Sequence, residues 1–206
     1  MGDDCCNKKG EALAKLAAQA EQRRVLIIVL VINAVMFFAE FSAGLVARSS
    51  ALQADAVDML GDAVVYGLSL FALGRGQRWE AGAALAKGGL ILVFFAVIVI
   101  DIALKLVHGV PPSTHLMLIF GSLALVANLT CLALLWRFRA LNVNMSSTFE
   151  CSRNDVIANL GVLVAAGAVA WFGAGWPDIV VGLAIALLFL RSAIRVIRSA
   201  WPEFRA

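Results

Sequence analysis

Long apolar stretches alternate with short polar connections along this chain, and each stretch has about the length that crosses a lipid bilayer. A membrane-spanning helix needs about 20 consecutive, predominantly apolar residues. Stretches of this kind cover residues 24–46, 51–73, 82–107, 115–137, 148–172 and 176–197. The pattern predicts an all-α integral membrane protein, built as a bundle of six transmembrane helices.

The second stretch, residues 51–73, is the most polar of the six, and a helix lying on the membrane surface is the alternative for it. The distribution of lysine and arginine argues against that alternative. Basic residues are frequent before the first stretch, after the second, after the fourth and after the sixth, and they are sparse in the other connections. This alternation is the positive-inside pattern of six spans with both termini in the cytoplasm. Removing the second span would break it.

The expected organisation is therefore one transport domain with short flanking tails. We expect a cytoplasmic tail over residues 1–22, a transmembrane domain over 23–198 and a second cytoplasmic tail over 199–206. The first residues lack the basic start and small-residue cleavage site of a signal peptide. The predicted location is a multi-pass position in a membrane, most simply the cytoplasmic (inner) membrane of a bacterium.

Composition agrees with a membrane protein and excludes some partners. The chain has 206 residues, of which 62% are hydrophobic and 15% charged, whereas a soluble domain has about a quarter of its residues charged. The formal net charge of +3 does not indicate nucleic acid as a partner, because the basic residues lie at membrane edges. The four cysteines are divided between a tail and apolar segments, so we expect reduced thiols and no disulfide framework.

Polar side chains inside the apolar stretches are the candidates for function, because such residues face the interior of a bundle or a pathway for a solute. They gather on the first, second and fifth stretches, and in chain order they are Asn33, Glu40, Asp55, Asp58, Asp62, Cys151, Asp155 and Asn159. The three aspartates of the second stretch are spaced i, i+3 and i+7, which places them on one helix face. An ionised carboxylate at the bilayer centre costs roughly 2.5–3.5 kcal/mol, so their presence needs a function.

Two pairs at i, i+4 spacing suggest a metal site. Asp58 with Asp62, and Cys151 with Asp155, each place two ligand groups one turn apart on one helix face. The second helix and the fifth cross the membrane in opposite directions, so Asp58 is expected level with Asp155 and Asp62 level with Cys151. Four such ligands can form the tetrahedron that zinc prefers. A thiolate shifts the preference toward zinc, cadmium and softer metals.

Several alternatives remain open for these residues. The paired carboxylates could form a proton relay that binds no metal, and Cys151 could be a small packing residue. Asp55 lies near the outer boundary, where a role in a gate or in the pathway fits it better than a role as ligand. Cys5 and Cys6 are weak candidates for capturing a soft metal, and a solvated tail is the other interpretation for them.

These residues resemble the cation diffusion facilitators, a family of proton-coupled exporters of divalent transition metals. The resemblance rests on "FFAEFSAGLVARSSALQADAVDMLGDA" across the first two helices and on "CSRNDVIANLGVLVAA" in the fifth. By position it implies a metal site at Asp58, Asp62, Cys151 and Asp155. Family members commonly have histidine at the position of Cys151, and often at that of Asp58 as well. The four positions of this site contain no histidine here, so carboxylates or the thiol would carry any exchanged proton.

The resemblance also implies the activity. It predicts a transporter and not an enzyme, without a cofactor, that exports Zn²⁺ or Cd²⁺ in exchange for protons, with Co²⁺, Ni²⁺, Pb²⁺ and Hg²⁺ as further candidate substrates. Asn33, Glu40 and Asn159 would line the pathway or hold the ligands. The family usually ends in a cytoplasmic domain that helps dimerisation; this sequence leads us to expect a short member without it, and a homodimer formed by membrane helices. The alternative function is a proton-coupled carrier of organic cations that uses the same acidic face.

Overall fold

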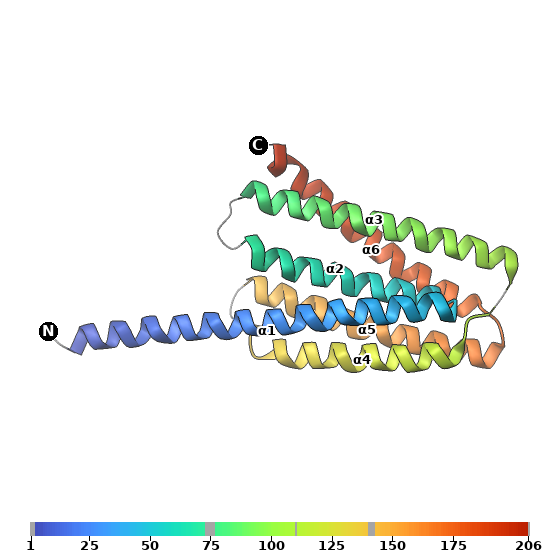
Figure 1. The fold of residues 1–206 in the computed structure, drawn as a ribbon, viewed down its shortest axis with the longest axis horizontal. Coiled ribbons are helices and arrows are strands. Elements are labelled where there is room, and N and C mark those ends of the chain that lie inside the picture. Colours follow the sequence, from blue (N-terminus) through green and yellow to red (C-terminus); the bar gives the residue numbers. More distant parts are fainter. Residues whose placement is uncertain (1–2, 73–76, 110, 140–142, 206) are drawn as a thin grey trace.

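Six helices make up the described part of the chain. The structure, a computed structural model, describes residues 3–72, 77–109, 111–139 and 143–205, with some side chains inside these ranges left out, such as those of residues 3–19 and 150–151. The helices are α1 (Asp3–Ala47), α2 (Ser50–Ala72), α3 (Gln77–His108), α4 (Thr114–Trp136), α5 (Val143–Phe172) and α6 (Trp176–Arg205). They lie roughly side by side and alternate in direction (Figure 1). The predicted all-α six-helix bundle is confirmed.

Both termini lie at the same end of the bundle, as an even number of crossings requires (Figure 1). We call this end the inner end and the opposite one the outer end. Helix α1 is longer than its predicted span, because the helical backbone starts at Asp3 and includes most of the segment that the sequence suggested as a tail. The part of α1 that is long and apolar enough to cross a membrane is Ala20–Ala47.

Helix α2, which carries three aspartates, lies at the centre of the bundle. Among the described residues, five helices contain stretches long and apolar enough to cross a membrane: Ala20–Ala47, Gly88–Val107, Thr114–Trp136, Ser152–Phe172 and Trp176–Pro202. Helix α2 lies among them and contacts α1, α3, α4, α5 and α6. Every residue from Ala51 to Val57 is buried. Because neighbouring helices shield it from lipid, α2 can carry carboxylates in the bundle interior.

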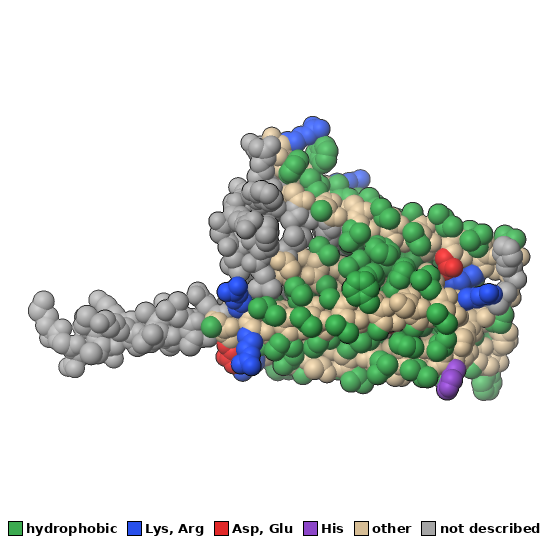
Figure 2. Space-filling model, viewed as in Figure 1, with side chains coloured by type: hydrophobic (Ala, Val, Ile, Leu, Met, Phe, Trp, Pro, Cys, Tyr) green, Lys and Arg blue, Asp and Glu red, His purple; other side chains and the backbone are tan. Residues whose placement is uncertain are grey.

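The surface agrees with a bilayer environment. In Figure 2, hydrophobic side chains cover the described middle of the bundle, and charged side chains appear toward its two ends. Large apolar residues of the outward helix faces are exposed, for example Phe38, Val107, Val126, Val164 and Leu188. In a soluble protein such an extended apolar surface would be a liability. In a membrane protein it is the face that contacts lipid.

The outer end is tightly packed. Helix α1 ends at Ala47, the following residue Arg48 has a positive φ of 54°, and the Ser49 amide donates to the Gly44 carbonyl at 2.9 Å. This closes α1 with a helix-ending turn and lets α2 start two residues later. A Cβ on Gly44 would lie 2.9 Å from the Gln53 side chain, and one on Gly182 of α6 would lie 2.7 Å from the Ser50 carbonyl carbon. Glycine therefore permits both close approaches to α2.

Candidate metal-transport site

A cavity of about 800 Å³ lies between α2, α5 and α6, with a contribution from α3. Three of the predicted ligands, Asp58, Asp62 and Asp155, line it. The rest of the wall is mostly apolar, apart from Asn154 and two arginines of α6, Arg191 and Arg195. The three carboxylates thus line one cavity that a solute could enter.

Asp58 and Asp155 meet across the two antiparallel helices. Their carboxyl groups lie within hydrogen-bonding range of each other. Asp155 is 4% exposed and Asp58 is half-buried. The register expected from the sequence, with these two residues level, is the register of the structure. Two carboxyl groups in contact repel each other unless a proton or a metal cation lies between them.

Asp62 lies one helical turn farther inward and has its own partner. The Tyr66 hydroxyl donates to Asp62 Oδ2 at 2.8 Å, and both side chains are buried. Asp62 is close enough to influence Asp155 electrostatically. Among the described side chains, no group of three or more histidine, cysteine, aspartate or glutamate residues is gathered closely enough to hold a metal ion. Asp58 and Asp155 form a close pair, and Asp62 stands beside them.

The cysteines predicted as metal ligands have side chains outside the described residues. Cys151 lies on helix α5 four residues before Asp155, and its side chain is outside the described residues. The side chains of Cys5 and Cys6 are outside them as well. Cys131 is a buried free thiol packed among apolar residues of α1, α2 and α4, so it belongs to the core.

Three of the four residues expected to line the pathway form a second buried polar group, about one turn outward of the aspartate pair. Asn159 Nδ2 donates to Asp55 Oδ2 at 2.7 Å. Glu40 of α1 lies within hydrogen-bonding range of Asp55. Asn33 lies farther along α1, donates to the Val29 carbonyl at 2.9 Å and approaches the Cys131 sulfur at 4.0 Å. Glu40, Asp55 and Asn159 therefore belong together, and Asn33 belongs to a neighbouring part of the interior.

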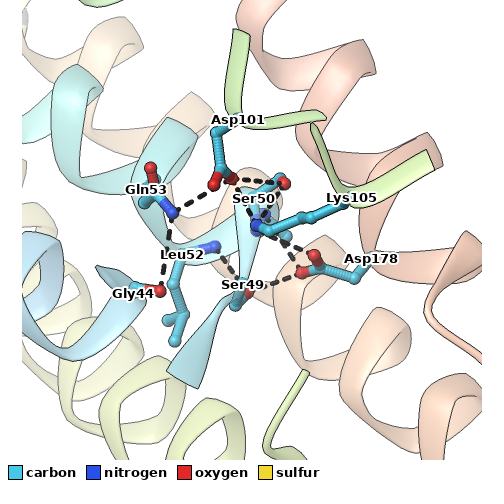
Figure 3. Close-up of polar contacts among 9 residues, drawn as sticks. Gly44, Ser49, Ser50, Leu52, Gln53, Asp101, Lys105 and Asp178 are labelled. Atoms are coloured by element: carbon cyan, nitrogen blue, oxygen red, sulfur yellow. Dashed lines mark hydrogen bonds and ion pairs between the residues drawn. The ribbon is translucent and has the colours of Figure 1, made fainter. Parts of the chain in front are cut away.

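A separate polar network closes the outer end (Figure 3). It joins the start of α2 to the last turns of α3 and the first turn of α6. Its members are Ser49, Ser50, Gln53, Asp101, Lys105 and Asp178. Lys105 forms an ion pair with Asp101 and donates to Ser50 Oγ at 2.7 Å. The Gln53 amide donates to Asp101 at 3.3 Å. These contacts bind three helices together at one level.

Asp178 is the centre of this network. Its Oδ2 accepts from the Ser50 amide at 2.7 Å, and its Oδ1 accepts from the Ala51 amide at 3.1 Å and from Ser49 Oγ at 2.5 Å. A carboxylate from α6 thus caps the amino end of α2, where free amides and the helix dipole favour negative charge. Ser49 adds the ordinary cap by accepting from the Leu52 amide at 3.1 Å.

Several of these residues were not identified as functional from the sequence. Tyr66 follows Asp62 at i+4, and that spacing was a usable signal for a side chain supporting a ligand. Arg191 and Arg195 were treated only as inner-edge charges, but they line the cavity. The outer network joins residues from three segments far apart in the sequence, so no periodic pattern could have revealed it.

Comparison with known proteins agrees with the resemblance. Residues 26–204 match the family model described as the cation efflux transmembrane domain. The chain is 23% identical over 196 residues, 88% of its length, to the "Cadmium, cobalt and zinc/H(+)-K(+) antiporter" of Bacillus subtilis. It is also 23% identical over 199 residues, 87% of its length, to the "Metal cation efflux system protein CzcD" of Cupriavidus metallidurans.

These relatives are longer than the chain, and each match covers 63% of the relative's length. The matched region nevertheless contains all six helices except the first part of α1 and the last residue of α6. It also includes both faces that supply the aspartates. The chain is thus a multi-pass membrane protein and belongs to the cation efflux family.

Proposed function

We propose that this chain exports divalent transition-metal cations, chiefly Zn²⁺ and Cd²⁺, from the cytoplasm in exchange for protons. The observation that carries the proposal is the meeting of Asp58 and Asp155 from two antiparallel helices at a cavity inside a membrane bundle. The names of the relatives, which mention cadmium, cobalt, zinc, protons and potassium, support the same class of substrate.

The metal would be held by Asp58, Asp62 and Asp155, with Cys151 as the fourth ligand. Carboxylate oxygens and a thiolate are ligands of zinc, at about 2.0–2.3 Å. Metal binding would draw Asp62 toward the Asp58–Asp155 pair, and it would neutralise the repulsion between these carboxylates. Because the ligands must lose their protons before they bind metal, protons from the outside compete for them and promote release. Tyr66 would orient Asp62 through its hydrogen bond.

The cellular setting follows from the same proposal. The inner end of the bundle, with both termini, would face the cytoplasm, and the membrane would be the inner membrane of a bacterium. A transporter of this kind needs no catalytic centre and no resident cofactor. A homodimer formed by membrane helices remains a prediction.

Metal flux in proteoliposomes tests the function directly. A dye trapped inside vesicles would report the entry of Zn²⁺, Cd²⁺, Co²⁺ or Ni²⁺, each measured with and without a pH gradient. We expect Zn²⁺ and Cd²⁺ signals that the gradient accelerates. Cys151→His should shift the relative rates from cadmium toward zinc, because a thiolate favours the softer metal. Absence of metal flux under every condition would refute the proposal, and unchanged relative rates would remove Cys151 from it.

An organic-cation carrier is the second candidate, and the size of the cavity favours it. A volume of about 800 Å³ with mostly apolar walls lies in the range of pockets for small organic molecules. Transport assays with a labelled lipophilic amine and with Zn²⁺ distinguish the two functions. An organic-cation carrier would transport a labelled lipophilic amine and give no zinc signal, whereas a metal exporter would give the opposite result.

A further inference from the structure

Two acidic side chains of the bundle interior lie outside the proposed metal site. Glu40 of α1 is 0% exposed and Asp55 of α2 is 1% exposed, and their carboxyl groups are within hydrogen-bonding range of each other. Neither residue lines the cavity that contains Asp58 and Asp155. The pair is thus a separate buried feature, and the metal ligands do not account for it.

The pair lacks the donors that two ionised carboxylates would need. Asp55 accepts one hydrogen bond, from Asn159 Nδ2 at 2.7 Å. No described group donates a hydrogen bond to either oxygen of Glu40, and the Asn159 Oδ1 atom receives none either. Ionised carboxylates only accept hydrogen bonds, and buried charges without partners are strongly unfavourable. The contact between Glu40 and Asp55 therefore requires a cation between or beside them.

The space and the ligands favour a proton as that cation. A dehydrated monovalent metal ion needs a shell of several oxygens in place of its water. Beyond the two carboxyl groups, the described contacts of the pair add one side-chain oxygen, that of Asn159. A proton needs only one oxygen from each carboxyl group, in the way that two close carboxyls share one proton in aspartic proteases.

We propose that Glu40 and Asp55 share one exchangeable proton, and that this pair is a second cation site that carries a proton of the metal–proton exchange. The inference rests on the proposed function and assigns part of its coupling to residues outside the metal site. Glu40 and Asp55 are the binding residues of this site, and Asn159 positions Asp55 through its hydrogen bond.

Coupling between the two sites follows from their arrangement. Asp55 lies about one turn outward of Asp58 on α2, and Asn159 lies one turn outward of Asp155 on α5. Asp58 acts electrostatically on Glu40, and Asp55 acts on Asp155. Both of these neighbours of the pair, Asp58 and Asp155, are acidic. On α4 the buried polar side chains, Asn128 and Cys131, are uncharged donors or acceptors.

Metal binding changes this field. A divalent cation at Asp58, Asp62 and Asp155 replaces repulsion with attraction, so the pair can release its proton to water on the open side. When the metal leaves on the other side, the acidic field returns and the pair takes up a proton from that side. Each cycle then moves one proton in the direction opposite to the metal, and the Glu40–Asp55 pair ends in its initial state.

Proton release on metal binding is the decisive measurement. Purified full-length protein in weakly buffered detergent solution would be titrated with Zn²⁺, while a pH indicator reports the protons released per metal bound. We expect Glu40→Gln and Asp55→Asn each to lower that number by about one. Because one proton is shared, the double variant should lose no more than either single variant. Glu21→Gln is the matched control, on the same helix but exposed and paired with Arg137 at 2.6 Å.

Infrared difference spectroscopy of the unmodified chain gives a result that does not depend on how the variants fold. Addition of Zn²⁺ should remove a carbonyl band of a protonated carboxyl group, and Glu40→Gln should abolish that change. A full proton count in both single variants would overturn the inference while leaving the metal transporter intact. Suppression of proton release by K⁺ but not Na⁺, lost in Glu40→Gln, would also overturn it by assigning the pair to potassium. Failure of the unmodified chain to bind or transport metal would refute the proposed function itself.

Discussion

The outer end of the bundle and the cavity inside it use aspartate in opposite ways. At the outer end, Asp178 accepts three hydrogen bonds, and two of them come from backbone amides of α2. Farther in, Asp58 and Asp155 face each other at a cavity. Both kinds of carboxylate are kept from lipid by neighbouring helices. They differ in what faces the negative charge: hydrogen-bond donors surround Asp178, whereas Asp58 and Asp155 face each other.

This difference separates a structural carboxylate from a ligand. Asp178 obtains all of its hydrogen-bond donors from the start of α2, so its contacts hold α6 against α2. In the proposed function, a bound cation neutralises the repulsion between the carboxylates at the cavity, and those carboxylates provide the affinity for the ion. Substitutions should therefore affect stability at the outer end and transport at the cavity.

The largest effect is expected for Asp155→Ala. Loss of a direct ligand should reduce metal flux in proteoliposomes by at least about a hundredfold, since changes in supporting groups around a metal already cost roughly tenfold to a hundredfold. Thermal unfolding of the metal-free protein should stay the same or shift upward, because a repelling buried carboxylate is removed. Normal flux in a correctly inserted variant would contradict the assignment of the site.

Asp178→Asn should show the reverse behaviour. The substitution keeps the shape but removes the charge that accepts from the Ser50 and Ala51 amides, and hydrogen bonds to charged groups contribute about 1.5–3 kcal/mol each. We expect the free energy of unfolding to fall by about 1–3 kcal/mol, measured by denaturation in detergent.

The comparison variant is Asp101→Asn in the same network. Asp101 is partly exposed and pairs with Lys105, and partly exposed ion pairs contribute about 0–1 kcal/mol. A larger loss of stability in Asp101→Asn than in Asp178→Asn would show that the ion pair, and not the helix cap, holds the outer end together.

Gly182→Ala tests the packing on which the outer cap depends. The added Cβ would lie 2.7 Å from the Ser50 carbonyl carbon and 2.8 Å from the Ala51 nitrogen, so α6 would have to move away from α2. Overpacking of this kind costs about 1–3 kcal/mol. Gly167→Ala on α5 is the control, since nothing lies within 4 Å of its Cβ position. Equal stability of the two variants would argue against a close contact between α2 and α6.

The sequence allowed the helices to be predicted well at the outer end. Predicted spans that end at 107 and 172 correspond to helices that end at His108 and Phe172, and the predicted starts at 51 and 176 correspond to Ser50 and Trp176. These ends are marked by glycine, proline and serine, which interrupt the apolar stretches. The inner ends differ more from the prediction. The sixth span was predicted to end at 197, but its basic amphipathic continuation stays helical to Arg205.

The candidate site could be predicted only as far as helical periodicity reaches. Spacing shows which residues of one helix share a face, and opposite crossing directions put Asp58 level with Asp155. Periodicity does not show which neighbour a face contacts. For that reason Asp55 was expected at a gate, whereas the structure buries it against Glu40 and Asn159. Whether it also acts in gating stays a prediction.

The smallest predicted effect is that of Tyr66→Phe, which tests whether the inner aspartates depend on any partner from the protein. The substitution keeps the ring in its buried position and removes only the hydroxyl that donates to Asp62. Because a single hydrogen bond of this kind contributes about 0.5–1.5 kcal/mol, zinc affinity should fall roughly twofold to tenfold. Titration with a competing zinc chelator measures the change. Thermal unfolding of the metal-free variant should move little, since Asp62 can then take a proton. A large loss of stability with unchanged zinc affinity would place Asp62 with Asp178 among the structural carboxylates. The contrast with the outer end would then rest on Asp58 and Asp155 alone.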